Sequence, residues 1–290
     1  MILYFVYRFY SWLVLSLPLK ISYWIAEKTG DCAYFLFKND RQKRVEIIKR
    51  VLGDKISQKR AKKIIRLSFQ NFNKSLVDFF RLSKLNSGNI DNFVKIIGQE
   101  NLDSALKEGN GAILAGLHVG NSGFSLTALA LKGYPVNIVV WKEKDEKVDG
   151  LFQSIRQSKG VKVIQSYNSA RRISRALKRN EIAAMAVDLN GGEKGIELNI
   201  WERKISIVRG PLLFALKQKA PVLPGIIIRQ SDNSHKIVIE KPIKIELTQN
   251  RKKDLETGML RLFKVFKKYI IEYPEQWYWV KSFWQEIEES

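Results

Sequence analysis

From about residue 90 onward, short apolar runs rich in β-branched residues alternate with amphipathic segments of helical spacing. Strands that alternate with helices predict an α/β fold, in which helices cover a largely parallel central sheet. The expected strands are Val94–Ile97, Gly111–Leu117, Val136–Val140, Val161–Gln165, Ile182–Val187, Val222–Ile228, Lys236–Glu240 and Ile243–Leu247. The expected helices are Leu102–Lys107, Phe124–Lys132, Gly150–Lys159, Ala170–Lys178, Pro211–Lys219 and Leu255–Tyr273.

The N-terminus is apolar and aromatic, and Arg8 is the single charged side chain before Lys20. A helix of residues 1–19 covers roughly 28 Å, which barely matches a bilayer core. Its aromatic side chains suit the zone between headgroups and acyl chains. A signal peptide is a poor interpretation, because no basic start precedes the apolar stretch and no small-residue cleavage site follows it. We expect a membrane-seated helix, spanning or interfacial; a buried core helix is the alternative.

Composition adds a strong positive charge, with 50 Lys and Arg against 29 Asp and Glu for a net charge of +21. Basic runs follow the apolar N-terminus, so three parts are expected: residues 1–37 at the membrane, a basic helical segment at 38–90 and an α/β domain at 91–290. Such charge suits an anionic membrane surface or an acidic carrier. No nucleic-acid partner is expected, since no nucleic-acid-binding motif is present. One cysteine and two histidines exclude a disulfide framework, a Cys-based zinc site and a multi-histidine metal centre.

One apolar strand ends at His118 and continues into a glycine-rich turn and a helix. Side chains at the carboxyl ends of strands lie where α/β proteins bind ligands, and a histidine there can act as a general base on a hydroxyl. Gly120, Asn121 and Gly123 are candidate oxyanion or turn contributors, because their backbone N–H groups surround a helix start. The alternative for Asn121 is a plain helix N-cap.

A second buried strand delivers Asp188 into another glycine-rich loop. Arg156, Arg209 and Arg203 are candidate substrate-binding residues, since a guanidinium group suits the oxygens of phosphate or a lipid headgroup. The alternative is that each is simply an exposed basic residue. His235 follows a hairpin-like turn and is expected to face solvent without a role.

Several segments together resemble the bacterial late acyltransferases of lipid A biosynthesis, within the lysophospholipid acyltransferase family. The similarity runs over nearly the whole chain. Its motifs are Gly98-Gln-Glu-Asn-Leu102, His118-Val-Gly-Asn, Arg156 with Gly160, Asp188, Gly210-Pro211 with Leu216 to Pro224, and Pro274-Glu-Gln-Trp-Tyr-Trp279. The aromatic terminus Trp277, Tyr278, Trp279, Phe283 and Trp284 is expected against the core or the membrane.

The resemblance implies transfer of a fatty acyl group from a thioester of acyl carrier protein or coenzyme A to a hydroxyl of a glycolipid or lysolipid, most simply in lipid A-type acylation. It implies a place on the cytoplasmic face of the inner membrane, and an apolar pocket for the acyl chain. His118 corresponds to the base that deprotonates the acceptor. No metal or resident cofactor is expected, because the thioester is already activated.

The chain departs from the family's H-x4-D/E motif, because Gly123 occupies the position of the acid and Ser122 that of the usual aromatic residue. Glycine cannot orient an imidazole, so three hypotheses stay open. Asp188 could supply the carboxylate, His118 could work unassisted at a large cost in rate, or the protein could be a non-catalytic lipid-binding paralogue.

Overall fold

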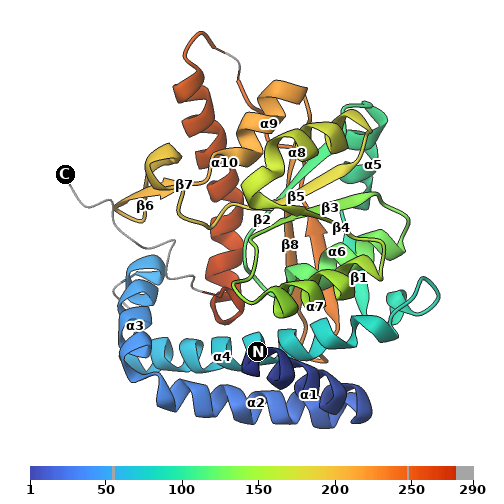
Figure 1. Ribbon diagram of the computed structural model, residues 1–290. Coiled ribbons are helices and arrows are strands. Elements are labelled where there is room, and N and C mark those ends of the chain that lie inside the picture. The colour runs from blue at the N-terminus through green and yellow to red at the C-terminus, as the bar shows by residue number, and fades with distance from the viewer. Residues whose placement is uncertain (54–55, 247, 279–290) are drawn as a thin grey trace.

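The computed structural model describes residues 1–53, 56–246 and 248–278. Within them, seven strands form one sheet in the order β1-β9-β8-β2-β5-β3-β4 (Figure 1). Strands β8, β2, β5, β3 and β4 run parallel, β9 is antiparallel to β8, and β1 is parallel to β9. The mostly parallel α/β sheet is therefore confirmed. The strands are β1 (Val94–Ile97), β2 (Ala112–Gly116), β3 (Val136–Val140), β4 (Lys162–Gln165), β5 (Ile182–Ala186), β8 (Val222–Arg229) and β9 (His235–Ile239).

The strand predicted at Ile243–Leu247 is wrong: residues 243–246 have no strand structure, and Leu247 lies outside the described residues. Strand β9 ends at Ile239. Beyond it, the N–H groups of Glu240 and Ile243 still donate to the carbonyls of Pro224 and Val222 at 2.9 Å, but Pro242 between them has no N–H to continue a regular ladder. A hairpin of β6 (Ile196–Ile200) and β7 (Arg203–Ile207) was not predicted. Trp279, Phe283 and Trp284 of the aromatic terminus also lie outside the described residues.

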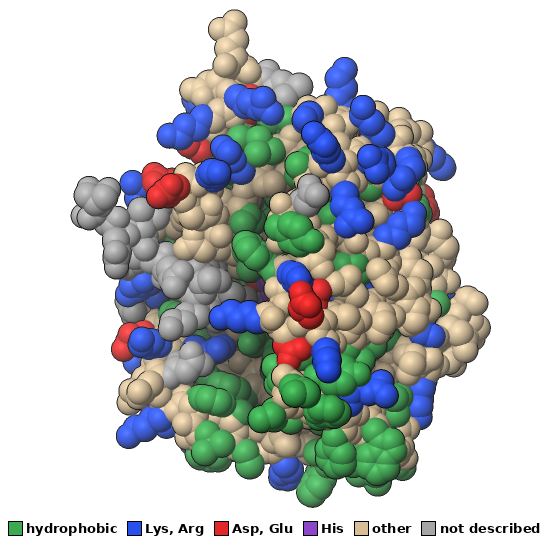
Figure 2. Space-filling model, viewed as in Figure 1, with side chains coloured by type: hydrophobic (Ala, Val, Ile, Leu, Met, Phe, Trp, Pro, Cys, Tyr) green, Lys and Arg blue, Asp and Glu red, His purple; other side chains and the backbone are tan. Residues whose placement is uncertain are grey.

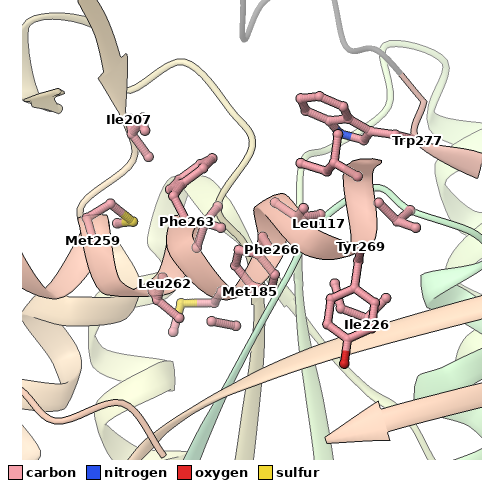
Figure 3. Close-up of a cluster of buried hydrophobic side chains, with 14 of the residues drawn as sticks. Leu117, Met185, Ile207, Ile226, Met259, Leu262, Phe263, Phe266, Tyr269 and Trp277 are labelled. Carbon is pink, nitrogen blue, oxygen red and sulfur yellow. The ribbon is translucent and has the colours of Figure 1, made fainter. Parts of the chain in front are cut away.

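Two hydrophobic clusters cover the two faces of the sheet. On one face lie α5 (Gln99–Lys107), α6 (Ser122–Leu131) and α7 (Glu146–Gln157). On the other lie α8 (Ser169–Lys178), α9 (Gly210–Gln218) and α10 (Arg251–Glu272). Figure 3 shows Phe266 and Tyr269 of α10 directed toward Met185 and Ile226 of the sheet. The carboxyl ends of the parallel strands open between these two layers.

The N-terminal helices form a separate layer beneath the sheet in Figure 1: α1 (Ile2–Ser16), α2 (Leu19–Leu36), α3 (Lys38–Leu52) and α4 (Gln58–Arg81). Pro18 separates α1 from α2, as its missing N–H and fixed φ dictate. Arg81 and Lys84 donate to the last carbonyl groups of α1, at Val14, Leu15 and Leu17. These bonds satisfy groups that the helix itself leaves unpaired and hold α1 against α4.

In the described part of the chain, no helix combines the length and the apolarity needed to cross a bilayer. The spanning form of the N-terminal prediction is therefore wrong. Large apolar side chains of α1 and α2 are nevertheless exposed, among them Ile2, Leu3, Phe5, Val6, Phe9, Trp12, Ile21 and Trp24. The opposite side of α1 packs inward, where Tyr7 and Tyr10 contact Phe80 of α4.

Candidate active site

His118 and Asp188 meet at the carboxyl edge of the sheet. They follow adjacent parallel strands in which Gly116 of β2 pairs with Ala186 of β5, and each lies two residues beyond its pair. Both side chains therefore leave the same edge, and Nδ1 of His118 lies 2.8 Å from Oδ1 of Asp188. This strand register places the carboxylate where the first of the three hypotheses, with Asp188 as the orienting acid, requires it.

Asp188 is fully buried, and its carboxylate accepts three hydrogen bonds. Oδ1 faces the imidazole, while Oδ2 accepts the backbone N–H of His118 at 2.8 Å and the indole Nε1–H of Trp277 at 2.9 Å. Burial by itself raises the pKa of this carboxyl, but the nearby His118 and these hydrogen bonds outweigh it and leave the pKa lowered. Asp188 is therefore an anion at neutral pH.

The same pair acts in the opposite direction on His118. Burial lowers the pKa of the imidazole, but the negative charge of Asp188 and the hydrogen bond to it outweigh burial and leave the pKa raised. Because Nδ1 points at a carboxylate, the neutral ring carries its proton there and presents the lone pair of Nε2. The side chain of His118 is 37% exposed, so Nε2 is accessible to a substrate.

Gly120 shapes the turn that follows His118. Its φ is +61°, and a Cβ there would lie 2.2 Å from the backbone oxygen of Ile227, so no larger residue fits. Its N–H donates to the carbonyl of Gln276 at 2.8 Å. Gly120 is thus a turn residue, and its N–H is not free to stabilise an oxyanion.

Asn121 is the N-cap of α6, as the alternative interpretation predicted. Its Oδ1 accepts the N–H of Phe124 at 3.1 Å, and its Nδ2 donates to the carbonyl of Ser75 at 3.1 Å and lies 3.3 Å from Oδ2 of Asp78. Both polar atoms of this buried side chain are occupied. The amide of Asn121 therefore holds α6 in place instead of pointing at a substrate.

Gly123, in the family's acid position, lies in the first turn of α6. A Cβ at this position would be 3.6 Å from both the Phe79 ring and Oδ1 of Asn121, in ordinary van der Waals contact. Position 123 therefore faces α4, and a Cβ fits there without a clash. The first N–H groups of a helix, here those of Ser122 and Gly123, have no partner within the helix.

A cavity of about 460 Å³ opens beside His118. Figure 2 shows a hollow in this face of the molecule, with hydrophobic side chains along its walls. Under α6, the sheet contributes Gly116, Ala184, Ala186 and Gly225 to the lining, and the side chain of Leu114 lies against Gly225. Leu126 and Leu129 of α6 form the roof. The small residues of the sheet thus leave an apolar space beneath α6, called here the channel.

The cavity also reaches the other side of the sheet edge. Met185, Ile173 and Phe214 line it there, and they belong to the cluster under α8 and α9. The space therefore passes from one face of the sheet to the other around the strand ends where His118 and Asp188 lie. Clefts of this size and apolar lining are typical of sites for small molecules and lipid chains.

Arg156 brings a positive charge to the wall of this cavity. Its guanidinium lies 5.1 Å from the ring centre of Phe79 and 5.9 Å from that of Phe152. Burial lowers its pKa, and its buried Nε has no hydrogen-bond partner. No ion pair joins it to a carboxylate of the described residues; nearby Asp149 instead accepts from the N–H of Glu143 and from glutamine side chains. Arg156 is thus a partly buried cation on the cavity wall, with Glu143 and Asp149 near it but no ion pair to either.

The other two candidate arginines lie farther from this chemistry. Arg209 is exposed at the N-cap of α9, although the adjacent Gly210 and Pro211 line the cavity. Arg203 begins β7, after a turn in which Trp201 and Glu202 have φ of +52° and +60°. Neither arginine lines the cavity as described.

His235 was predicted to face solvent, and this is wrong. It begins β9, is only 3% exposed, pairs with Val94 of β1 and Arg229 of β8, and stacks on Phe124 with ring centres 4.4 Å apart. Its Nε2 lies 3.4 Å from Oδ2 of Asp78. A short loop after β8 folds the residue back into the sheet, where strand pairing buries it.

Asp78, which no sequence-based prediction included, lies at the centre of a buried polar network. Its carboxylate binds Arg229 of β8 and the hydroxyl of Tyr23 in α2, each at 2.5 Å, and approaches Asn121. The side chains of Asp78 and Arg229 are 3% and 5% exposed. An acid directly before two phenylalanines in an otherwise apolar helix face was the one available signal. No feature of the sequence indicated that Trp277 is a hydrogen-bond partner of Asp188.

Comparison with known proteins places these features in context. The sequence model of the family described as bacterial lipid A biosynthesis acyltransferase matches residues 1–286. The phosphatidylinositol mannoside acyltransferase of Mycolicibacterium smegmatis is 24% identical over 165 residues, 56% of this chain and 54% of that protein, so the match spans about half of its length. The crystal structure of the 1-acyl-sn-glycerophosphate acyltransferase PlsC from Thermotoga maritima aligns with 90% of this chain and 99% of its own, at 14% identity and a TM-score of 0.42.

Proposed function

Because the chain belongs to the bacterial lipid A biosynthesis acyltransferase family, whose members are acyltransferases, we propose that it transfers a fatty acyl group from a thioester to a hydroxyl of a glycolipid or lysolipid. The donor is acyl carrier protein or coenzyme A, and lipid A-type acylation is the proposed reaction. The observation that carries this proposal is the pair of His118 and Asp188 at the edge of an apolar cavity.

In this mechanism Nε2 of His118 takes the proton of the acceptor hydroxyl as its oxygen attacks the thioester carbonyl carbon. A C–O bond forms and the carbonyl electron pair moves to oxygen, which gives a tetrahedral oxyanion. The intermediate collapses, the C–S bond breaks, and the proton on His118 passes to the leaving sulfur. Asp188 fixes the tautomer of the ring and stabilises the imidazolium form.

The N-terminus of α6 is the proposed oxyanion site. The N–H groups of Ser122 and Gly123 are among those the helix leaves unpaired, and the helix dipole favours negative charge there. Ser122 lines the cavity together with His118. The turn at Gly120 contributes by fixing the direction in which α6 begins.

The acyl chain and the anionic group of a substrate would bind different parts of the cavity. The channel between α6 and the small residues of the sheet suits an acyl chain, because apolar walls bury methylene groups without polar competition. Arg156 suits a phosphate or another anionic group of a substrate, since its guanidinium forms no ion pair with a described carboxylate and is held over two aromatic rings. Binding there would give the Arg156 guanidinium a direct ion pair, which it does not make with nearby Glu143 or Asp149.

The N-terminal helices would bind the cytoplasmic face of the inner membrane as an interfacial layer. Phe5, Phe9 and Trp12 on α1 and Trp24 on α2 form an exposed apolar surface, and Lys20 is exposed between them. Aromatic and aliphatic side chains next to lysine suit the boundary of an anionic bilayer. The substrates would then enter the cavity from the lipid phase or from a carrier in solution.

The test is acyl transfer by the purified protein, with acyl-carrier and coenzyme A thioesters as donors and extracted lipids as acceptors. We expect turnover by the unchanged protein, no turnover by His118→Ala, and a loss of about 10³- to 10⁴-fold in kcat for Asp188→Asn. His235→Gln controls for general effects of losing a histidine. Full activity in His118→Ala would overturn the mechanism.

Gly123 favours one second candidate, a non-catalytic lipid-binding paralogue. Gly123→Glu separates the two, and a Cβ at position 123 meets its neighbours only in ordinary van der Waals contact. If Asp188 is the orienting acid, Gly123→Glu leaves the rate unchanged or lowers it by placing a carboxylate near Arg156. An inactive unchanged protein with turnover restored by Gly123→Glu would support the paralogue.

A further inference from the structure

Trp277 contacts the proposed catalytic pair directly, although it lies far from both residues in sequence. It follows the short 3-10 turn Pro274–Gln276, and its side chain is completely buried. Its indole Nε1 donates to Oδ2 of Asp188 at 2.9 Å. A buried indole N–H is expected to find a polar partner, and here that partner is the carboxylate behind the histidine.

The two carboxylate oxygens of Asp188 accept from different donors, and this fixes the orientation of the carboxylate. Oδ2 accepts from Trp277 and from the backbone N–H of His118, which leaves Oδ1 for the imidazole. Rotation of the carboxylate would break both bonds to Oδ2. The direction of Oδ1, and with it the orientation of the His118 ring, therefore depends on these two donors, of which the indole is the one from a side chain.

The segment around Trp277 is itself held rigidly against the catalytic turn. The carbonyl of His118 accepts the N–H of Tyr278 at 2.8 Å, and the carbonyl of Gln276 accepts the N–H of Gly120 at 2.8 Å. The side chain of Gln276 exchanges two hydrogen bonds of 2.8 Å with the backbone of Arg229 at the end of β8. Residues 276–278 thus join the His118 turn to the next strand of the sheet.

We propose that Trp277 is a positioning residue for acyl transfer, whose indole N–H holds Asp188 in the orientation that orients His118. The inference rests on the proposed function of His118 and Asp188. It explains how a chain with Gly123 in the family's acid position keeps its histidine oriented. The carboxylate comes from a neighbouring strand, and the C-terminal segment fixes its rotation.

Trp277 also packs in the core, where Trp201 lies with its ring centre 5.8 Å away. Figure 3 places Trp277 at one end of the buried cluster that α10 forms with the sheet. A structural role and a positioning role must therefore be separated. Trp277→Phe removes the N–H but keeps an aromatic ring, and Trp201→Phe makes the same change in the neighbouring indole as a matched control.

The kinetic test measures kcat and KM for acyl transfer in both variants and in a double-mutant cycle with Asp188→Asn. We expect Trp277→Phe to lower kcat about 10- to 100-fold with little change in KM, the range seen when a supporting hydrogen bond is lost. Trp201→Phe should retain kcat. In the Asp188→Asn background Trp277→Phe should add almost nothing, because its effect passes through the carboxylate. Full additivity would overturn the proposal.

A second readout does not depend on turnover. The chain has two histidines, so ¹⁵N-histidine labelling with His235→Gln assigns the ring nitrogens of His118. We expect shifts of one fixed tautomer, with the proton on Nδ1, in the unchanged protein and in Trp201→Phe. Trp277→Phe should shift toward a mixture of tautomers. Unchanged ring shifts in Trp277→Phe would refute the positioning role, whereas absent turnover with the expected shifts would refute only the proposed function.

Discussion

The ion pair of Asp78 and Arg229 allows the most quantitative prediction, because both of its side chains are buried. Nη2 of Arg229 lies 2.5 Å from Oδ2 of Asp78, and the side chains are 5% and 3% exposed. Asp78→Asn keeps the shape of the side chain but leaves a buried guanidinium without its counter-charge. Removing one partner of such a pair costs about 3–5 kcal/mol of unfolding free energy. We expect Asp78→Asn to be destabilised by about that amount.

The assay is urea-induced unfolding followed by circular dichroism, with the free energy extrapolated to water. Replacing both partners by apolar residues, as in Asp78→Leu with Arg229→Met, should restore much of the loss, since no uncompensated charge is then buried. Glu146→Gln, in an exposed pair with Lys142, is the control and should change stability little. A loss below about 1 kcal/mol for Asp78→Asn would refute the reasoning, because it would mean that water reaches the pair.

The pH dependence of this contribution follows from the direction of the shift. Burial raises the pKa of Asp78, but the charge of Arg229 and the bonds from its neighbours outweigh burial and leave it lowered. A carboxyl with a lowered folded-state pKa contributes stability above its unfolded pKa of about 3.9 and loses it as pH falls toward the folded value. The difference in unfolding free energy between the unchanged protein and Asp78→Asn should therefore become smaller below about pH 4.

Three further predictions concern activity and membrane binding. The rate of acyl transfer should fall as pH drops through the raised pKa of His118, with a midpoint above about 6.5. Asp188→Asn should move that midpoint to lower pH. A midpoint that Asp188→Asn does not change would contradict the assignment of His118 as the base. Ala186→Leu places a larger side chain in the channel beneath α6. With a series of acyl donors, kcat/KM for the longest accepted acyl chain should fall at least about tenfold relative to shorter chains. Equal losses for all chain lengths would mean that the acyl chain binds elsewhere. Phe9→Ser with Trp12→Ser should weaken sedimentation with anionic vesicles about tenfold, whereas Leu260→Ser on α10 should not.

The central sheet and the position of the site were predictable because they depend on local patterns. Apolar β-branched runs alternate with helical segments, so the parallel sheet follows from chain order. His118 and Asp188 each end a buried strand, and polar residues at the carboxyl ends of parallel strands gather at one edge. Their adjacency required only that the two strands be neighbours, which the structure shows for β2 and β5.

What could not be predicted depends on contacts between distant parts of the chain. His235 sits beside turn residues, so its local sequence favours exposure, yet pairing with β1 and β8 buries it. Asp78 is buried through partners in α2, β8 and α6, none of which lies near it in sequence. Trp277 reads as an ordinary core aromatic, and only the folded chain brings its N–H to Asp188.

The buried network also links the proposed membrane layer to the catalytic turn. Tyr23 of α2 and Asn121 bind the same carboxylate of Asp78, and Asn121 caps the helix whose first N–H groups form the proposed oxyanion site. A displacement of α2 on a lipid surface would therefore act on α6 through a single side chain. Tyr23→Phe removes the hydroxyl's bonds to Asp78 and Arg229 without removing a charge. It should therefore separate the two roles: vesicle binding is retained, while stimulation of turnover by vesicles is lost. If Tyr23→Phe responds to vesicles like the unchanged protein, the network is a structural tie and carries no such coupling.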